Sequence, residues 1–339
     1  MANVSFKPVW TDKPNSADRL TRYGRETAHQ KVSIVVPVRN EEKSLVRLVE
    51  SLLCQSHKPD EIVLVDGGSV DNTVRIAKNY VDRGVRVLEI GPAYPGRGRN
   101  EGIKAARNDW IALIDAGCVA DQRWLENLVR SILDKDVGVV FGLFTPRIEN
   151  EWDVAQALAF VGPFSGDGCR PWFTASCLLH KSVWEEVGGF PEHLRAAEDL
   201  VFFERIRSAG VMVARCAKAD VHWNLSRNVG GVFRRLRLYS AHHLAAGMWR
   251  TWHLRVFAMD LLALFMAIGA ILWPPAAALL MIAVTARVFR SAYERRLNII
   301  DGQAFRPDRL LRVAVLLFVA DLAAWLGAGD LVLGRAASR

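Results

Sequence analysis

The chain has 339 residues, of which 51% are apolar types and 24% are charged, and its mean hydropathy is +0.10. This composition excludes a mostly disordered chain, and the length allows two domains. The net charge of +8 suits phosphate-bearing ligands, an anionic membrane surface or nucleic acid. The five cysteines are widely spaced and form no C-x-x-C pair, so we expect neither a disulfide framework nor a zinc ribbon.

The first thirty residues are polar and lack the apolar stretch of a secretory signal. We expect residues 1–30 to form an N-terminal extension that stays in the cytoplasm. A short apolar run at residues 32–38 then predicts a buried strand, and the leucines that follow lie on one helical face. Further strands are predicted at 62–65, 85–90, 110–114 and 137–144, with helices from about residue 71, at 100–106 and at 124–132. This alternation predicts an α/β domain over residues 31–227, with a mainly parallel sheet flanked by helices.

Polar residues follow the ends of four of these strands. They are Glu41 after the first strand, Asp66 after the second, Arg99 and Asn100 after the third, and Asp115 after the fourth. In a parallel sheet such strand ends share one edge, where ligands bind. Carboxylates, arginine and helix N-termini suit a nucleoside diphosphate, with one acid for a divalent ion. Between the third strand and the helix at 100–106, we expect a glycine-rich loop at this edge.

Some of these polar residues, and two acids further along the chain, also have a purely structural interpretation. Asp66 suits an Asx turn, together with Ser69 and Asp71, before the next helix. The acids Glu198 and Asp199 suit the first turn of a helix that runs to residue 208. The glycines of residues 96–102 do not match a dinucleotide fingerprint, because they follow the third strand and have the spacing G-x-G-x-x-x-G. Because the polar residues that follow the four strands meet at one edge, a shared ligand site is favoured over separate structural roles.

The C-terminal third of the chain has the pattern of a membrane region. Residues 228–255 carry arginines and tryptophans at helical spacing, which predicts an interfacial amphipathic helix. Residues 256–286 form an apolar run whose only ionisable member is Asp260. Because Pro274 and Pro275 interrupt it, we expect a hairpin of two spans over about 256–290, with a single kinked helix as the alternative.

A third apolar helix is predicted over about 313–333, within an all-α membrane region of residues 256–339. Its acids, Asp321 and Asp330, are expected to lie near an interface or an arginine. Arginines flank the hairpin on both sides, whereas its turn carries none. The positive-inside rule then predicts a multi-pass protein of the plasma (inner) membrane whose catalytic domain is cytoplasmic.

Five segments together resemble the ordered motifs of family 2 glycosyltransferases, which have the GT-A fold: SIVVPVRNEE, VDGGSVDNT, GRGRNEGI, ALIDAGC and RAAEDLVFFERI. The resemblance covers about residues 31–237. It implies a membrane-bound inverting enzyme that transfers a sugar from a nucleotide-sugar donor to an acceptor hydroxyl of a lipid-linked or cell-surface glycan.

The resemblance also implies roles for particular residues. Asp199 would be the catalytic base. The nucleotide sugar would be bound by six residues: Pro37, Glu41, Asp66, Arg99, Asn100 and Asp115. Asp115 would also hold a divalent cation, Mn²⁺ or Mg²⁺, on the diphosphate.

The sequence departs from the family pattern at two acids. Gly117 stands where the family has the second acid of an Asp-x-Asp motif, and Gly67 replaces the acid expected beside Asp66. His222 is the candidate for a further metal ligand beside Asp115, although a histidine before a tryptophan also fits a structural role. The arginine and tryptophan signature of processive synthases is degraded at residues 234–239, which favours the addition of a single sugar.

The sequence is also compatible with two other functions. The glycines at positions 67 and 117 would suit a catalytically inactive membrane adaptor that still binds nucleotide sugars, and the fold would also suit a processive polysaccharide synthase. Nucleic acid is not expected as a partner. The arginines cluster beside apolar runs, which indicates membrane lipids instead.

Overall fold

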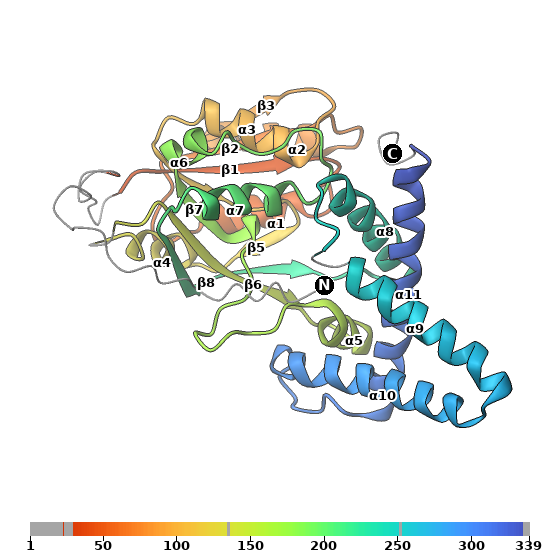
Figure 1. Cartoon of the computed structure of the whole chain (residues 1–339). Helices are drawn as coiled ribbons and strands as arrows, with labels where there is room; N and C mark the ends of the chain where they lie inside the picture. Colours follow the sequence, from red (N-terminus) through yellow and green to blue (C-terminus); the bar gives the residue numbers. More distant parts are fainter. Residues whose placement is uncertain (1–22, 24–29, 134–135, 251–252, 335–339) are drawn as a thin grey trace. The chain divides into compact units, whose positions relative to one another are not determined.

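The structure is a computed structural model that describes residue 23 and residues 30–133, 136–250 and 253–334. Most of the predicted N-terminal extension lies outside the described residues, as do residues 251–252 of the predicted amphipathic helix. The chain divides into two compact units (Figure 1). The first, here called the sheet unit, contains the described residues up to Thr145 together with Gly166–Asn224. The second, here called the helical unit, contains Pro146–Ser165 and the described residues from Leu225 onward. Pro146–Ser165 thus belongs with the C-terminal helices, although the predicted α/β domain included it.

The sheet unit is built on one sheet of eight strands, in the order β3-β2-β1-β4-β7-β6-β8-β5. The strands are β1 Val32–Val38, β2 Glu61–Asp66, β3 Val85–Glu89, β4 Trp110–Leu113, β5 Cys118–Ala120, β6 Val139–Arg147, β7 Cys177–His180 and β8 Val213–Asn224. Strands β1 to β4 pair in parallel, as predicted. Strand β7 pairs antiparallel with β4 and β6, and β5 pairs antiparallel with β8. The predicted α/β fold class is confirmed, with an antiparallel half that the sequence did not indicate.

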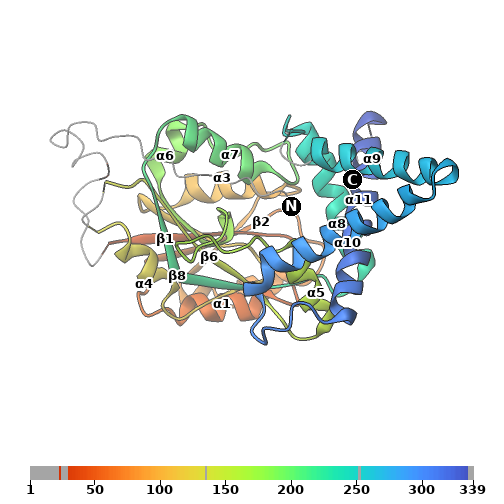
Figure 2. The same cartoon turned by 60° about the horizontal axis from the view of Figure 1, so that its bottom comes forward.

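Helices cover both faces of this sheet. They are α1 Leu45–Leu53, α2 Thr73–Lys78, η1 Val81–Arg83, α3 Pro95–Ala105, α4 Trp124–Arg130, η2 Thr174–Ser176, α6 Lys181–Glu186 and α7 Glu198–Ser208. Figure 2 shows α3, α6 and α7 on one face and α1 and α4 on the other. The leucine face of α1 is buried as the sequence predicts, because apolar residues at helical spacing meet the sheet together.

The helix predicted at 100–106 is present as α3, but the glycine-rich loop expected before it is wrong. Residues 96–99 already belong to this helix, which begins at Pro95, a residue that favours the first helical position. A Cβ atom on Gly102 would lie 2.3 Å from Cγ1 of Val35, and one on Gly98 would lie 3.0 Å from Cβ of Pro37. The glycines therefore let α3 approach strand β1 closely, and this approach brings the helix to the edge where the strands end.

The helical unit contains α5 Glu151–Phe160, α8 Val229–Ala245, α9 His253–Leu272, α10 Pro275–Arg295, η3 Arg296–Asn298 and α11 Pro307–Val332. Three of its helices, His253–Leu272, Pro275–Asn298 and Pro307–Val332, are long and apolar enough to cross a membrane. A helix thus lies on each side of Pro274. The amphipathic helix α8 is shorter than expected, because the chain turns at Gly247, whose φ of +73° is left-handed.

The carboxylates within these apolar helices have polar partners. Arg287 pairs with Asp321 through two contacts of 2.5 and 2.7 Å, and Arg237 pairs with Asp330 through two of 2.6 Å. The indole nitrogen of Trp325 donates to Asp260 at 2.8 Å. The acids of α11 therefore lie beside arginines, as expected for costly charges in an apolar region.

Candidate active site

The polar residues predicted from the strand ends come from one edge of the sheet. Strands β1, β2 and β4 run parallel, so their carboxyl ends lie side by side. Asp66 is the last residue of β2, Glu41 follows β1, and Asp115 follows β4. The topology therefore brings these three carboxylates to a common edge, as the sequence predicts.

The loops after β1 and β2 are tied together by side-chain hydrogen bonds. The carboxylate of Asp66 accepts from the backbone nitrogens of Gly68 and Ser69 at 3.0 Å each, which is an Asx turn. The side chain of Asn40 accepts from the backbone nitrogen of Val70 at 2.9 Å. These bonds leave Asp66 buried and engaged with the protein, so its contact with a nucleoside stays a prediction.

Arg99 is the centre of the site. This buried guanidinium donates through Nη2 to Oδ1 of Asp115 at 2.6 Å and through Nη1 to Oε1 of Glu198 at 2.7 Å. Burial alone would lower the pKa of Arg99, but the two carboxylates together raise it. A permanently charged arginine therefore links the end of β4 to the start of α7.

Asp199 lies next to this arginine bridge, in the first turn of α7. Ala197, which precedes the helix, has a left-handed φ of 67°, a conformation that is costly for a residue with a Cβ. Burial raises the pKa of Asp199 to about 7; the neighbouring Glu198 and Asp115 raise it as well, whereas Arg99 lowers it. A carboxylate with a pKa near neutrality is suited to accept a proton in catalysis.

Glu41 occupies the region where the family pattern expects a second acid. Its Oε2 lies 3.7 Å from the position that a Cβ atom on Gly117 would take, and it accepts a hydrogen bond from the hydroxyl of Ser44. Burial raises the pKa of Glu41, and the nearby carboxylates of Asp71 and Asp115 raise it further. Carboxylates that crowd one another in this way fit a divalent cation, so the residues present are compatible with a metal on the diphosphate.

Asn100 and Pro37 have mainly structural contacts. The amide nitrogen of Asn100 donates to the carbonyl oxygen of Phe190 and to Glu192, both at 2.9 Å. Its amide oxygen accepts from Trp184 and from the backbone nitrogen of Phe190, also at 2.9 Å. The side chain of Pro37 faces Gly98 of α3. Both residues position the elements around Arg99, and their contact with a nucleotide stays a prediction.

His222 is placed with a different carboxylate from the one predicted. Its Nε2 lies 2.8 Å from Oδ1 of Asp121, and among the described residues this is its one ion-pair partner. Strand register puts His222 opposite Val119 of β5. The structure therefore does not bring His222 and Asp115 together as an ion pair.

Sequence reasoning missed the role of Glu198 as the partner of Arg99. The residue was considered only as an acid in the first turn of a helix. A buried arginine needs carboxylates that compensate its charge. Asp115 supplies one such carboxylate, so a second partner such as Glu198 could have been sought. The partner itself depends on the long-range approach of α7 to α3, which no local pattern encodes.

Comparisons with known proteins agree with this fold. Residues 33–186 match the family model described as Glycosyl transferase family 2. Glycosyltransferase GlyG of Streptococcus pneumoniae is 35% identical over 114 residues, which cover 33% of this chain and 38% of that protein. O-antigen chain rhamnosyltransferase WbaN of Salmonella anatum is 26% identical over 183 residues, which cover 49% of this chain and 57% of that protein. The chain thus spans less than two thirds of the length of either relative.

A solved structure has a similar architecture. The mannosyltransferase PcManGT from Pyrobaculum calidifontis, in complex with GDP-Man and Mn²⁺, superposes with a TM-score of 0.61 at 16% identity, and the match covers 87% of each chain. At this identity the likeness concerns the fold alone. Over residues 33–186 this chain is therefore similar to family 2 glycosyltransferases, and the fold of the solved mannosyltransferase agrees with that similarity.

Proposed function

We propose that this chain is a membrane-bound inverting glycosyltransferase that moves one sugar from a nucleotide-sugar donor to an acceptor hydroxyl of a lipid-linked or cell-surface glycan. The observation that carries the proposal is the Arg99 bridge. Through it, the carboxylate assigned to the donor side, Asp115, is joined to the start of α7, where Asp199 lies. The buried guanidinium of Arg99 therefore fixes the position of Asp115 relative to the helix that carries the proposed base.

On the donor side, the nucleotide sugar would lie along the edge formed by the ends of β1, β2 and β4. Pro37, Glu41 and Asp66 would line the nucleoside pocket, and Arg99 and Asn100 would support the edge on which the diphosphate lies. Asp115, with Glu41 nearby, would hold Mn²⁺ or Mg²⁺, which when bound offsets the negative charge of the departing diphosphate.

On the acceptor side, Asp199 would act as general base. Its carboxylate takes the proton of the acceptor hydroxyl while that oxygen attacks the anomeric carbon. The bond between this carbon and the diphosphate oxygen breaks, and the nucleoside diphosphate leaves with the electron pair. Attack from the side opposite the leaving group inverts the anomeric configuration. The partial burial of Asp199, which raises its pKa to about 7, keeps the group basic enough to accept this proton.

The helical unit would hold the enzyme at the plasma (inner) membrane as a multi-pass protein. Three of its helices have the length and composition of membrane spans. Their flanks are rich in arginine, which supports a cytoplasmic side for both ends of the hairpin and contacts with anionic lipid headgroups. An acceptor attached to a membrane lipid would then be presented beside a cytoplasmic catalytic domain.

The proposal is tested by a donor screen with the full-length chain in detergent or vesicles. Nucleotide sugars are offered with a lipid-linked acceptor fraction, the product mass identifies the sugar added, and nuclear magnetic resonance of the new linkage gives its anomeric configuration. We expect a mass increase of one sugar and inversion relative to the donor. Retention of configuration would contradict the assignment of Asp199, and a ladder of added sugars would favour a processive synthase.

The inactive adaptor is distinguished by calorimetry. An adaptor binds the nucleotide sugar but releases no nucleoside diphosphate with any acceptor. If neither nucleotide binding nor release is detected with Mn²⁺ or Mg²⁺ present, both candidate functions fail.

A further inference from the structure

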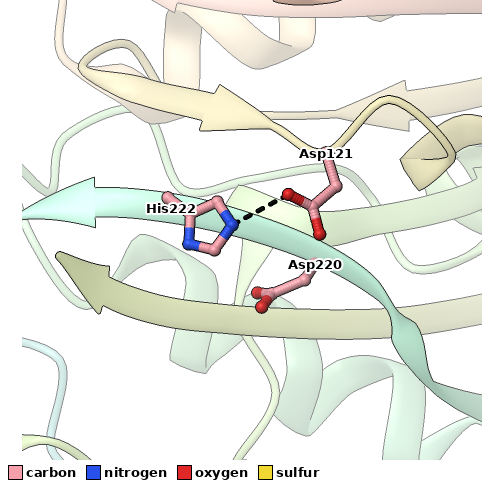
Figure 3. Close-up of side chains that lie close together, drawn as sticks. All are labelled: Asp121, Asp220 and His222. Atoms are coloured by element: carbon pink, nitrogen blue, oxygen red, sulfur yellow. Dashed lines mark hydrogen bonds and ion pairs between the residues drawn. The ribbon is translucent and has the colours of Figure 1, made fainter.

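A second group of potential metal ligands lies in the sheet unit, outside the Arg99 site. It consists of Asp121, Asp220 and His222, whose ligand atoms all lie within 4.8 Å of one another. Asp121 directly follows the short strand β5, whereas the other two residues belong to β8. Figure 3 shows the imidazole of His222 and the two carboxylates facing a common space.

The pairing of β5 with β8 fixes this arrangement. Ala120 is opposite Val221, and the backbone nitrogen of Asp121 donates to the carbonyl oxygen of Asp220 at 3.1 Å. His222 Nε2 and Oδ1 of Asp121 are 2.8 Å apart. The cluster thus rests on strand register and joins positions that are 101 residues apart in the chain.

A buried oxygen of Asp220 points to a ligand. Oδ2 of Asp220 accepts a hydrogen bond from the hydroxyl of Thr145 at 2.7 Å. Oδ1 is shielded from solvent, and within the described part of the chain it has no hydrogen-bond partner. A buried acceptor without a donor costs about 1–3 kcal/mol, so native structures rarely leave one unless a water or an ion completes it.

The charge of the cluster also favours a cation. Asp121 and Asp220 place two carboxylates within 4.8 Å of one another, and Asp220 is partly buried. A divalent ion would supply the missing positive charge.

We propose that Asp121, Asp220 and His222 bind a divalent transition-metal ion, with Nε2 of the imidazole and one oxygen of each carboxylate as ligands. One nitrogen and two oxygens are a donor set that Zn²⁺ accepts, and three protein ligands leave a fourth position for water. Mg²⁺ and Ca²⁺ prefer sites made of oxygen alone. Within the described residues, no hydrogen bond or ion pair joins any of the three ligands to Arg99, Asp115 or Asp199. The metal site is therefore independent of the proposed sugar transfer.

Such an ion would act as a cross-link at the sheet edge. Strand β5 is short and lies at the end of the sheet, where it pairs with β8 only. Asp115 precedes this strand, and Asp121 follows it. An ion that ties Asp121 to β8 would therefore fix the far end of the segment whose near end carries Asp115, and it would raise the unfolding temperature of the sheet unit.

To test this, metals are first removed from the full-length chain in detergent by a chelator and dialysis. The protein is then titrated with Zn²⁺ in the presence of a chromophoric chelator that competes for the ion. We expect one high-affinity site per chain, which persists in Asp115→Asn. His222→Ala should weaken it by at least about tenfold. The control is His57→Ala, which removes another partly buried imidazole whose Nε2 contacts only the carbonyl oxygen of Gln30 among the described residues, and it should bind Zn²⁺ like the wild type.

Circular dichroism shows whether His222→Ala is folded. If it is not, two further measurements test the site. Asp220→Asn preserves the size of the side chain, and it should also lower the affinity by at least about tenfold. X-ray absorption of the Zn²⁺-loaded wild type should show one imidazole nitrogen among oxygen ligands. Wild-type protein without saturable Zn²⁺ binding would overturn the site, as would equal affinities of the wild type, Asp220→Asn and His222→Ala.

Discussion

Replacing Arg99 with methionine should destabilise the fold strongly, because it deprives a buried carboxylate of its counter-charge. The side chains of Arg99 and Glu198 are only 4% and 7% exposed, and their N–O distance is 2.7 Å. Removing one partner of a buried pair costs about 3–5 kcal/mol. Asp115 is 38% exposed, so losing its contact with Arg99 adds at most about 1 kcal/mol. We therefore expect Arg99→Met to lose about 3–6 kcal/mol of unfolding free energy.

The assay is urea unfolding of the full-length chain in detergent, followed by tryptophan fluorescence. Arg97→Met is the matched control, since Arg97 lies on the same helix but is exposed, and its loss should stay within about 0.5 kcal/mol. Glu198→Gln combined with Arg99→Met removes both charges, so the double variant should be more stable than the sum of the single losses by at least about 1 kcal/mol. Equal losses for Arg97→Met and Arg99→Met, or strictly additive single losses, would refute the buried bridge.

Three further predictions concern catalysis, packing and the membrane. Because Asp199 must be deprotonated to act as a base and its pKa is about 7, kcat/KM should rise with pH, and be roughly tenfold lower at pH 6 than at pH 8; a flat profile over this range would argue against Asp199. Gly102→Ala places a methyl group against Val35 and should cost about 1–3 kcal/mol in urea unfolding, whereas Gly166→Ala, which enters open space, should not. Alkaline carbonate washing should leave the full-length chain in the membrane pellet, and its recovery in the supernatant would contradict the predicted spans.

Local patterns predict the parallel half of the sheet well. The run at residues 32–38 is strand β1 with the same bounds, because a continuous apolar run bounded by polar residues is the pattern of a strand buried on both faces. The antiparallel strands β5, β7 and β8 were not predicted. Strand β5 has three residues, and β8 is mostly half-buried with no clear alternation, so their pairing depends on distant partners that periodicity does not report.

The site was predicted in its location but only partly in its contacts. The parallel strands place Glu41, Asp66 and Asp115 at one edge, which follows from topology. Gly96 and Gly98 were predicted to lie in a loop before the helix, yet they belong to the first turns of α3. Close packing of this helix against β1 outweighs the local cost of glycine in a helix. The Arg99–Glu198 bridge and the association of His222 with Asp121 arise from tertiary contacts that the sequence does not indicate.

Comparing nucleoside diphosphate release with donor binding in Asp199→Asn tests whether Asp199 is the catalytic base. The wild type, Asp199→Asn and Glu204→Gln, an exposed acid on the same helix, are assayed with the donor found by the screen. We expect Asp199→Asn to bind the donor with wild-type affinity in calorimetry but to release the diphosphate about 10²–10⁴-fold more slowly, while Glu204→Gln behaves like the wild type. Full-rate release by Asp199→Asn would contradict the claim that the edge of the sheet joins a donor site to a base on α7.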